Sequence, residues 1–426
     1  MKTLKLTLIM SLAMLNLFSQ TYFEGGIYND TEWTAENSPY IITGDVVLFP
    51  DKTLTIQPGV EVKFNGYYFL EIRGILISIG TDSSRIVYTS NLSTPNKSDW
   101  EGIKIKNNQG ARASFEYCDF LYAEYANSVE CCWEGGPIYF KNCIFDNNYF
   151  ALYGYTGYDI EVDSCEFTNN TYCIGNADKI VTNSQFIGNE YGLYETERIN
   201  VRKSIFQDND IALFGGRGLV DSCIIDNNNI GVKPLFEGFE LRFNQITNNT
   251  IGIQLSNDGG YYPPVKNNNI CNNLTYNVEN LDDTNKDLTE NCWCTSDSAT
   301  IENKLFDGYD NIYLGLFNYD IYDENCETKL KSVIKVDLGS GIYLANILDI
   351  VNVFPNPFQS NLNIVFKSSQ IEQVSISVYN LYGQEVYNNT YFENNIILPI
   401  ENLNSGIYVC SIRTGAFIIN KKIIKR

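Results

Sequence analysis

The sequence predicts an all-β protein: a right-handed parallel β-helix solenoid followed by a small Ig-like β-sandwich. Two observations carry this prediction. The middle of the chain repeats every 19 to 25 residues, and residues 350–426 hold alternating apolar residues separated by glycine-containing turns. A repeat of this length is a supersecondary unit that buries its apolar face only by stacking against its neighbours.

Composition and charge narrow the chemistry. Of the 426 residues, 44% are hydrophobic and 19% are charged, which indicates a folded rather than a disordered chain. Histidine is absent, which excludes Ser-His-Asp and Cys-His nucleophilic sites and histidine zinc sites. The formal net charge is −21. A protein that binds the phosphate backbone of nucleic acids carries positive charge, so no nucleic-acid partner is expected.

Residues 1–20 have the order of a secretory signal peptide. Lys2 and Lys5 form a basic start, an apolar stretch follows, and Ser19 offers a small residue for cleavage. No later apolar run is long enough to cross a bilayer, so no transmembrane segment is expected. Residues 21–40 are expected to cap the open edge of the first coil, because a bare strand edge promotes aggregation.

Residues 41–280 are predicted to form the solenoid, because several columns of similar residues recur in register. The repeat markers are Phe120, Phe145, Phe167, Phe186, Phe206, Ile225, Ile246 and Ile270. Three residues after a marker stand Asn148, Asn170, Asn189, Asn209, Asn228, Asn249 and Asn273. Two residues before a marker stand Cys118, Cys143, Cys165, Ser184, Ser204, Cys223, Asn244 and Asn268. Coils that stack in parallel about 4.8 Å apart align such columns, and asparagine amides bond those above and below. About ten coils are expected.

The solenoid carries a family resemblance. The segments 54–60, 80–81 and 100–103 resemble the start of bacterial parallel β-helix proteins with pectate-lyase-like coils. Residues 291–295, Ile301 and 307–310 resemble the segment after the helix in secreted Bacteroidetes members, although Cys294 stands where a glycine is usual. Residues 281–348 are therefore assigned to a post-helix cap and linker, with a short helix within 298–305.

Residues 349–426 resemble the C-terminal sorting domain of the type IX secretion system. Four blocks occur in order, and they contain Pro355, Asn356, Pro357, Gly383, Gly406, Tyr408 and Lys421. Its predicted inward-facing residues are Ile364, Phe366, Val374, Ile376, Val378, Val386, Tyr408 and Ile412. The resemblance implies that the type IX secretion machinery is a partner and that the source is one of the Bacteroidetes. It also implies removal of the domain, with release or attachment to the outer surface of a Gram-negative bacterium.

The twelve cysteines have two interpretations. Those in the repeat column are predicted to be buried thiols that act as small core residues. The pair Cys131-Cys132, and Cys292 and Cys294 with Cys326, are the candidates for disulfides. A zinc site at Cys292 and Cys294 is the weaker alternative in an oxidising compartment.

A catalytic interpretation rests on one exposed column. In the β-helix enzyme class, lyases use calcium-binding aspartates with a basic residue, and hydrolases use clustered aspartates. Arg202, Asp221 and Arg242 are expected to stack as neighbours and are the weak catalytic candidates. A ladder of opposite charges that solvates an outer face is the favoured reading, because no column holds successive aspartates.

A binding interpretation rests on aromatic residues beside acids in the longer coils. Exposed tyrosines suit sugar rings, which have apolar faces and hydroxyl rims. The candidates are Trp133, Glu134, Tyr153, Tyr155, Tyr158, Asp159 and Tyr194. Phe214 is also expected to point outward. The alternative is that these rings fold over the solenoid. Loose calcium binding by the acidic chain, with Asp282, Asp283, Asp307 or Asp310 contributing, is a further option, but no metal site is assigned.

The leading function is a secreted or cell-surface protein that binds glycan or mediates surface adhesion. The alternatives are a polysaccharide lyase or glycoside hydrolase of the same fold and a purely structural surface protein. Fold alone does not choose among them, because function depends on the site.

Overall fold

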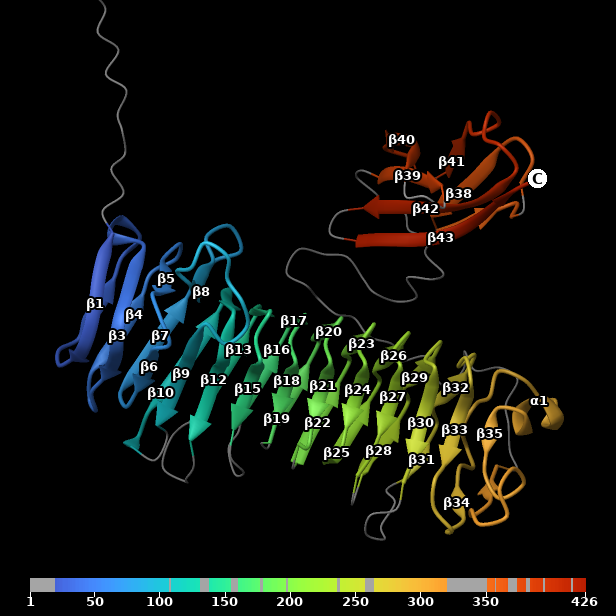
Figure 1. The fold of residues 1–426 in the computed structure, drawn as a ribbon, viewed down its shortest axis with the longest axis horizontal. Coiled ribbons are helices and arrows are strands. Elements are labelled where there is room, and N and C mark those ends of the chain that lie inside the picture. Colours follow the sequence, from blue (N-terminus) through green and yellow to red (C-terminus); the bar gives the residue numbers. More distant parts are fainter. Residues whose placement is uncertain are drawn as a thin grey trace, which may run out of the picture. The chain divides into compact units, whose positions relative to one another are not determined.

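The computed structural model describes residues 20–426 apart from 107–108, 131–137, 155–159, 177–178, 197, 236–237, 257–263, 320–350, 357, 367–373, 381–383, 394 and 415–416. The chain forms two compact units that divide near residue 343. The first is a parallel β-helix of about 11 turns whose strands stand in rows (Figure 1). This confirms the predicted fold class. No helix among the described residues is long and apolar enough to span a membrane.

Each coil of the solenoid contributes strands to three faces. The first face contains β5 (Glu61–Phe64), β8 (Ile86–Ser90), β11 (Cys118–Leu121), β14 (Ile144–Asp146), β17 (Glu166–Thr168), β20 (Gln185–Ile187), β23 (Ile205–Gln207), β26 (Ile224–Asp226), β29 (Gln245–Thr247) and β32 (Asn269–Cys271). The second face contains β6 (Phe69–Ile72), β9 (Trp100–Lys106), β12 (Ala123–Glu130), β15 (Phe150–Gly154), β18 (Tyr172–Gly175), β21 (Tyr191–Tyr194), β24 (Ile211–Phe214), β27 (Ile230–Lys233), β30 (Ile251–Leu255), β33 (Tyr276–Asn280) and β35 (Leu305–Phe306). The third face contains β2 (Thr31–Trp33), β4 (Thr53–Ile56), β7 (Ile75–Ile79), β10 (Arg112–Glu116), β13 (Ile138–Lys141), β16 (Ile160–Asp163), β19 (Lys179–Thr182), β22 (Arg198–Arg202), β25 (Arg217–Asp221), β28 (Gly238–Arg242) and β31 (Val265–Lys266).

The two ends of the solenoid differ in construction. β1 (Thr21–Ile27) pairs in parallel with β3 (Tyr40–Leu48), and β2 pairs with β4, so residues 21–40, where the sequence suggested a cap, pair as a coil. A short 3-10 helix (Ala35–Asn37) lies between β2 and β3. At the other end, β34 (Lys286–Asp287) pairs with β36 (Phe317–Asn318). The predicted short helix is α1 (Ser298–Glu302), whose N-cap Asp297 accepts a hydrogen bond from the Thr300 N–H.

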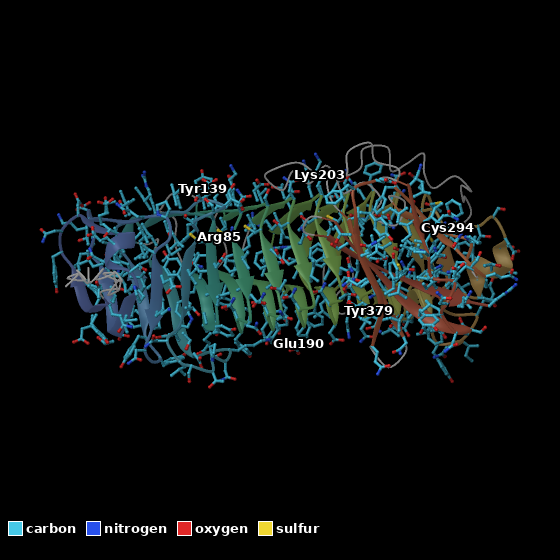
Figure 2. The ribbon with its side chains drawn as sticks, turned by 90° about the horizontal axis from the view of Figure 1, so that it is seen from above. Arg85, Tyr139, Glu190, Lys203, Cys294 and Tyr379 are labelled. Carbon is cyan, nitrogen blue, oxygen red and sulfur yellow. A yellow bond between two sulfur atoms is a disulfide. The ribbon has the colours of Figure 1, made fainter. Side chains whose placement is uncertain are left out.

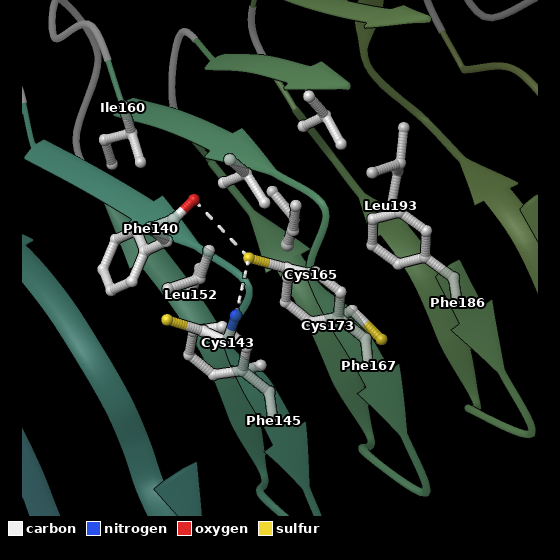
Figure 3. Close-up of a cluster of buried hydrophobic side chains, with 14 of the residues drawn as sticks. Phe140, Cys143, Phe145, Leu152, Ile160, Cys165, Phe167, Cys173, Phe186 and Leu193 are labelled. Carbon is white, nitrogen blue, oxygen red and sulfur yellow. Dashed lines mark hydrogen bonds between the residues drawn. The ribbon is translucent and has the colours of Figure 1, made fainter. Parts of the chain in front are cut away.

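The markers form the hydrophobic core of the first face. Phe145 stacks on Phe167 with 4.8 Å between ring centroids, and Phe167 stacks on Phe186 at 4.6 Å, with interplanar angles of 4° and 2°. Figure 3 shows these rings beside the buried thiols of Cys143, Cys165 and Cys173. Parallel stacking of identical rings across coils gives one continuous core along the solenoid.

The asparagine column forms the predicted ladder. From Asn170 to Asn273, each Oδ1 accepts from both the backbone N–H and the Nδ2 of the asparagine one coil earlier. The Nδ2 group also donates to a marker carbonyl, as Asn170 does to Phe145 at 2.8 Å. These amides are buried, and the ladder satisfies backbone groups at the corner where the strand hydrogen bonds are interrupted.

The column before each marker serves the same purpose at the other corner of the first face. The Cys165 N–H donates to Ser184 Oγ at 3.1 Å, and the Ser184 N–H donates to Ser204 Oγ at 3.2 Å. Farther along, Asn244 Oδ1 accepts from the Cys223 N–H at 2.9 Å. A small residue with an acceptor atom is what this position requires, which explains the alternation of cysteine, serine and asparagine.

Left-handed backbone conformations occur at both corners of the first face. Asn142 (φ 53°) precedes β14, and Asn147 (φ 57°) follows it, and the same two positions recur in later coils. The left-handed residue is therefore the neighbour of the ladder asparagine rather than the ladder residue itself. Asparagine and aspartate tolerate this conformation better than most residues.

Residues 351–426 form the second unit, an antiparallel sandwich. One sheet contains β37 (Val351–Phe354), β38 (Leu362–Phe366) and β41 (Asn395–Leu398), and the other contains β39 (Val374–Asn380), β40 (Glu385–Tyr391), β42 (Gly406–Thr414) and β43 (Phe417–Lys425). The predicted inward-facing residues are buried except Val386, which is 38% exposed. The prediction for Val386 is wrong because the pairing of β39 with β40 shifts register between Val378 and Tyr379.

Candidate functional site

A row of outward-facing aromatic residues crosses the second face of the solenoid. We call this row the aromatic strip, and it extends over β12, β15, β18, β21 and β24. Its members are Tyr125, Phe150, Tyr153, Tyr172, Tyr191, Tyr194 and Phe214. Apolar side chains continue beyond the strip at Ile211, Ile230 and Ile251, in register with Tyr191.

An extra residue in each strand of the strip turns the rings outward. The ladder pairs Tyr172 with Tyr191 and Ile174 with Leu193, and it omits the residue between them. That residue points inward beside another inward residue, so it has to be small. A Cβ on Gly192 would lie 2.9 Å from the Phe206 ring and 2.5 Å from the Ala212 carbonyl oxygen. A bulge of this kind changes which side chains face outward.

The first column of the strip is a stack of rings. Phe150 stacks on Tyr125 at 5.3 Å, Tyr172 stacks on Phe150 at 4.4 Å, and Tyr191 stacks on Tyr172 at 5.1 Å. The interplanar angles lie between 4° and 17°. The faces of these rings therefore pack against one another, and Phe150 is largely covered by its neighbours.

The second column lies across the first. Tyr194 packs edge to face on Tyr172 at 4.5 Å and stacks on Phe214 at 5.5 Å. Tyr153 packs edge to face on Phe150 at 5.2 Å. Between Tyr153 and Tyr194 the register position is held by Gly175, where a Cβ would lie 2.9 Å from the Phe150 ring. The glycine lets Phe150 lean across, so the two columns form one surface.

The hydroxyl groups of Tyr172, Tyr191 and Tyr194 are protonated hydrogen-bond donors, because their pKa values are raised. Burial among neighbouring rings raises the pKa of Tyr172 to about 12. Burial, followed by the charges of Glu190 and Asp210, raises the pKa of Tyr191. The pKa of Tyr194 is raised by burial and then by Glu195. Half-buried tyrosines of this kind offer an apolar edge and a polar tip at one surface.

One border of the strip is polar and mostly acidic. Glu190 and Asp210 are exposed and directly precede Tyr191 of the strip and Ile211, which continues its column. Lys97, from the segment between β8 and β9, reaches this border and donates from Nζ to Thr171 Oγ1 at 3.3 Å. Burial lowers the pKa of Lys97. Tyr149, 38% exposed, packs edge to face on Phe150 and Tyr172.

The structure places two of the seven predicted binding residues, Tyr153 and Tyr194, on the strip. Phe214, also expected to point outward, lies beside them. Trp133, Glu134, Tyr155, Tyr158 and Asp159 lie outside the described residues. Their segments follow directly on β12 and β15, two strands of the strip.

The predicted catalytic column lies on the third face. Arg202, Asp221 and Arg242 are register partners on β22, β25 and β28. Each is bonded within its own coil, however: Arg202 Nε donates to Asn200, Asp221 accepts from Ser222 Oγ at 2.6 Å, and Arg242 pairs with Glu240.

The carboxylates of the first face are also used in turns. Asp146 Oδ1 accepts from Thr168 Oγ1 at 2.7 Å and from Asn169 Nδ2 at 2.8 Å, one coil later. Asp226 holds Thr247 and Asn248 in the same way. Among the residues that the structure describes, no group of three or more aspartates, glutamates, histidines or cysteines is arranged to hold a metal ion. Asp307 is buried and accepts from the Tyr309 and Phe317 N–H groups.

The cysteines divide as the repeat pattern predicts. Cys118, Cys143, Cys165 and Cys223 are free and buried, and burial raises the pKa of Cys223 to about 12. Cys294 forms a disulfide with Cys271, which is not among the candidates that the sequence suggests. Cys292 is also disulfide-bonded. The candidates Cys131, Cys132 and Cys326 lie outside the described residues.

The described sorting-motif residues lie directly after β37 and on β42 and β43. Pro355 and Asn356 follow β37 and are exposed, and Gly406 begins β42 opposite Lys425 of β43. Tyr408 is buried and its hydroxyl donates to the Asn404 carbonyl oxygen at 2.8 Å. Lys421 lies on β43 opposite Cys410. Pro357 and Gly383 lie outside the described residues.

The residues that the sequence predicts to face outward include three of the seven strip members, Tyr153, Tyr194 and Phe214. Tyr172 and Tyr191 stand five residues after their markers, and the columns alone did not tell which way they point. The row of small residues that follows them, Ala151, Cys173, Gly192 and Ala212, was the available signal. A small residue repeated between two larger ones marks an inward position with little room.

Comparisons with known proteins identify the family of the second unit, and they give no function for the first. Residues 352–426 match the family of secretion system C-terminal sorting domains. The protein is thus a secreted one, directed to the cell surface or beyond. A stretch of 85 residues is 36% identical to Protein bark beetle of Drosophila melanogaster, and covers 20% of this chain but 3% of that protein.

Solved structures of the periplasmic alginate epimerase AlgG are similar to a large part of this chain. One covers 69% of this chain and 84% of its own, with 12% identity and a TM-score of 0.37. Two mutants of that enzyme give TM-scores of 0.36 and 0.35, with 12% and 13% identity and coverage of 66% and 67% of this chain against 76% and 77% of theirs. At these values the likeness carries no argument about activity.

Proposed function

We propose that the solenoid of this secreted protein binds neutral glycan chains at the aromatic strip. The observation that carries the proposal is the strip itself, in which seven aromatic residues lie on five neighbouring strands of one face. Aromatic side chains that gather on neighbouring strands, rather than scatter singly over the surface, favour a recognition surface.

The chemistry of the strip suits a sugar chain that runs along the solenoid axis. Neighbouring rings of the first column are separated by 4.4 to 5.3 Å, a spacing comparable to the length of one pyranose ring. Successive sugars would meet successive tyrosine edges. The apolar ring edges contact sugar C–H groups, and the phenol hydroxyls bond to sugar hydroxyls.

The charge of the border favours neutral over acidic chains. Glu190, Asp210 and Glu195 are exposed beside the strip, and the chain as a whole carries −21. A polymer of uronic acids would bring like charges together at this surface, which disfavours association. A neutral glycan instead finds carboxylate acceptors for its hydroxyl groups. Calcium held loosely between the carboxylates would weaken this discrimination, so the binding measurement is made with and without it.

The catalytic alternative has a weaker basis in the described residues. A lyase or hydrolase needs carboxylates that converge on one groove. Asp146 and Asp226 instead bond to turn residues, and Arg242 pairs with Glu240. A purely structural surface protein is the remaining alternative, and it would need no contact between the strip and a sugar.

Replacing Tyr191 and Tyr194 together by alanine is expected to weaken binding to a neutral polysaccharide at least roughly tenfold. The double variant removes two hydroxyl contacts of about 1 kcal/mol each and the ring edges that frame them. Native affinity electrophoresis of the chain without residues 1–20 measures the effect, in gels that contain neutral or acidic polysaccharides. Staining each gel for polymer detects cleavage.

The matched control is Tyr139→Ala. Tyr139 is 42% exposed on β13 of the third face, and Figure 2 places it on the side of the solenoid opposite Glu190. This variant should keep full binding. Equal loss in the control and the double variant, or retardation by acidic polymers only, would reject the proposed site. A cleared zone would replace the binding function with the catalytic one.

A further inference from the structure

The first and last segments of the sorting domain are hydrogen-bonded to each other. Residues 355–358 follow β37 near the start of the domain, and residues 424–426 end the chain. The N–H of Phe358 donates to the carbonyl oxygen of Ile424, and the N–H of Arg426 donates to the carbonyl oxygen of Phe358, each at 2.9 Å. Phe358 and Lys425 thereby form a parallel bridge.

The side chain of Asn356 completes this pairing. Its Oδ1 accepts from the N–H of Ile424 at 2.9 Å, 68 residues away in the chain. The amide thus stands in for the backbone carbonyl that a full neighbouring strand would present. On its other edge β43 pairs with β42, with Ile424 opposite Ile407 and Lys425 opposite Gly406. Ile424 and Lys425 are therefore held on both edges, and Arg426 is held by Phe358 on one.

Side-chain packing adds to the hydrogen bonds. Phe358 is fully buried in the core of the sandwich, and the Lys425 ammonium lies over its ring, 5.4 Å from the centroid. Lys425 itself is 8% exposed. A cation over an aromatic ring at this distance is attracted by the ring electrons. The chain terminus is thus an ordered element of the domain.

We propose that Asn356 is a positioning residue for secretion: it holds the C-terminal strand in the paired conformation that the type IX machinery binds. In this proposal the machinery reads a folded surface made by both ends of the domain. The Pro-Asn-Pro sequence fits this role, because proline fixes its backbone dihedral and donates no N–H. The asparagine between the two prolines then supplies the acceptor from a defined position.

The test is secretion of the full-length protein from a Gram-negative host that carries the type IX system, measured as the ratio of periplasmic to surface and medium fractions. Asn356→Ala removes the acceptor and is expected to lower the secreted fraction at least fivefold. Asn356→Asp keeps an acceptor oxygen at the same place and is expected to be secreted like the parent protein. Glycan binding plays no part in this assay, so the two proposals succeed or fail separately.

A second variant separates positioning from simple loss of stability. Ile396→Ala on β41 opens the core, because Ile396 is 2% exposed, and it should lower the midpoint of thermal unfolding as much as Asn356→Ala or more. Secretion of Ile396→Ala near the parent level, with retention of Asn356→Ala, supports the proposal. Equal retention of these two variants, normal secretion of Asn356→Ala, or failure of Asn356→Asp to be secreted overturns it.

Discussion

Replacing Asn189 by alanine is expected to destabilise the solenoid by about 3–5 kcal/mol, a large effect for one substitution. The Asn189 side chain is 3% exposed and makes four hydrogen bonds. Its Oδ1 accepts from the N–H and the Nδ2 of Asn170, and its Nδ2 donates to the Phe167 carbonyl oxygen and to Asn209 Oδ1. Alanine leaves the buried Asn170 N–H of the preceding coil without its acceptor and takes one hydrogen bond each from Asn170 Nδ2, the Phe167 carbonyl oxygen and Asn209 Oδ1.

The position of Asn189 in a continuous ladder increases this effect. Amides from Asn148 to Asn277 are linked one to the next, and hydrogen bonds in such a chain strengthen one another. Each coil contacts only its neighbours, so the loss should be local as well as global. The N–H of Asn170, which bonds to Asn189 Oδ1, should exchange with solvent much faster in the variant.

Chemical denaturation and amide hydrogen exchange measure the two parts of this prediction. Asn200→Ala is the matched control, because Asn200 lies on the outer side of β22 and bonds to exposed Arg202. The control should change stability by no more than about 0.5 kcal/mol. A denaturation midpoint for Asn189→Ala equal to that of the control would show that the ladder contributes little.

The ladders also explain why so much of the fold could be predicted from the sequence. A column that repeats in register constrains residue type, because each side chain stacks on the one below. The marker column requires a buried apolar side chain, and the asparagine column requires an amide that both donates and accepts. The position two before the marker accepts three residue types, and it was still recognised because cysteine, serine and asparagine share a small size and an acceptor atom.

The repeat was not recognised in the coil that follows Asn273, because this coil departs from the marker and asparagine columns. Asn291 continues the small-residue column beyond Asn268, which donates to its Oδ1 from both the backbone N–H and Nδ2. The spacing of 23 residues between them lies within the repeat range and was the available signal. Because Asn291 was not aligned with Asn268, the proximity of Cys294 to Cys271 was not predicted. The partners of a disulfide depend on which coils are neighbours, and the column of cysteines does not show which coils are adjacent at this end.

The direction of the aromatic residues was harder to predict than their recurrence. An alternating strand would place residues five and seven after the marker on the same side. The extra small residue between them reverses this, so Tyr191 faces outward and Leu193 is buried. The candidate site therefore depends on a bulge, a feature for which a single sequence gives a weak signal.

Replacing Lys179 by methionine is expected to stabilise the protein by several kcal/mol at pH 6 and by little at pH 10.5. Lys179 is 2% exposed on β19, between Ile160 and Ile199 of the neighbouring coils. Its Nζ donates to the Gly175 carbonyl oxygen at 2.9 Å. Burial lowers the pKa of this ammonium to about 7, whereas an unfolded lysine has a pKa of about 10.4.

The sign of the pH dependence follows from proton binding. Between pH 7 and about 10.4, the unfolded chain holds a proton on Lys179 that the folded chain lacks, so stability rises with pH in this range. Below pH 7 both states are protonated and the full penalty is present, at about 1.4 kcal/mol for each unit of pKa difference. Methionine has similar length and no charge, so it removes the penalty and fills the same space.

Unfolding midpoints of the parent and the Lys179→Met variant across pH 6 to 10.5 test this expectation. The gap between them should be widest at pH 6 and should close toward pH 10.5. Lys141→Met is the control: Lys141 is exposed on β13 and pairs with Glu116 at 3.6 Å, an ion pair of a kind that contributes 1 kcal/mol or less. A constant gap across the pH range would mean that Lys179 keeps its proton inside the solenoid, and that its carbonyl partner compensates the cost of burial.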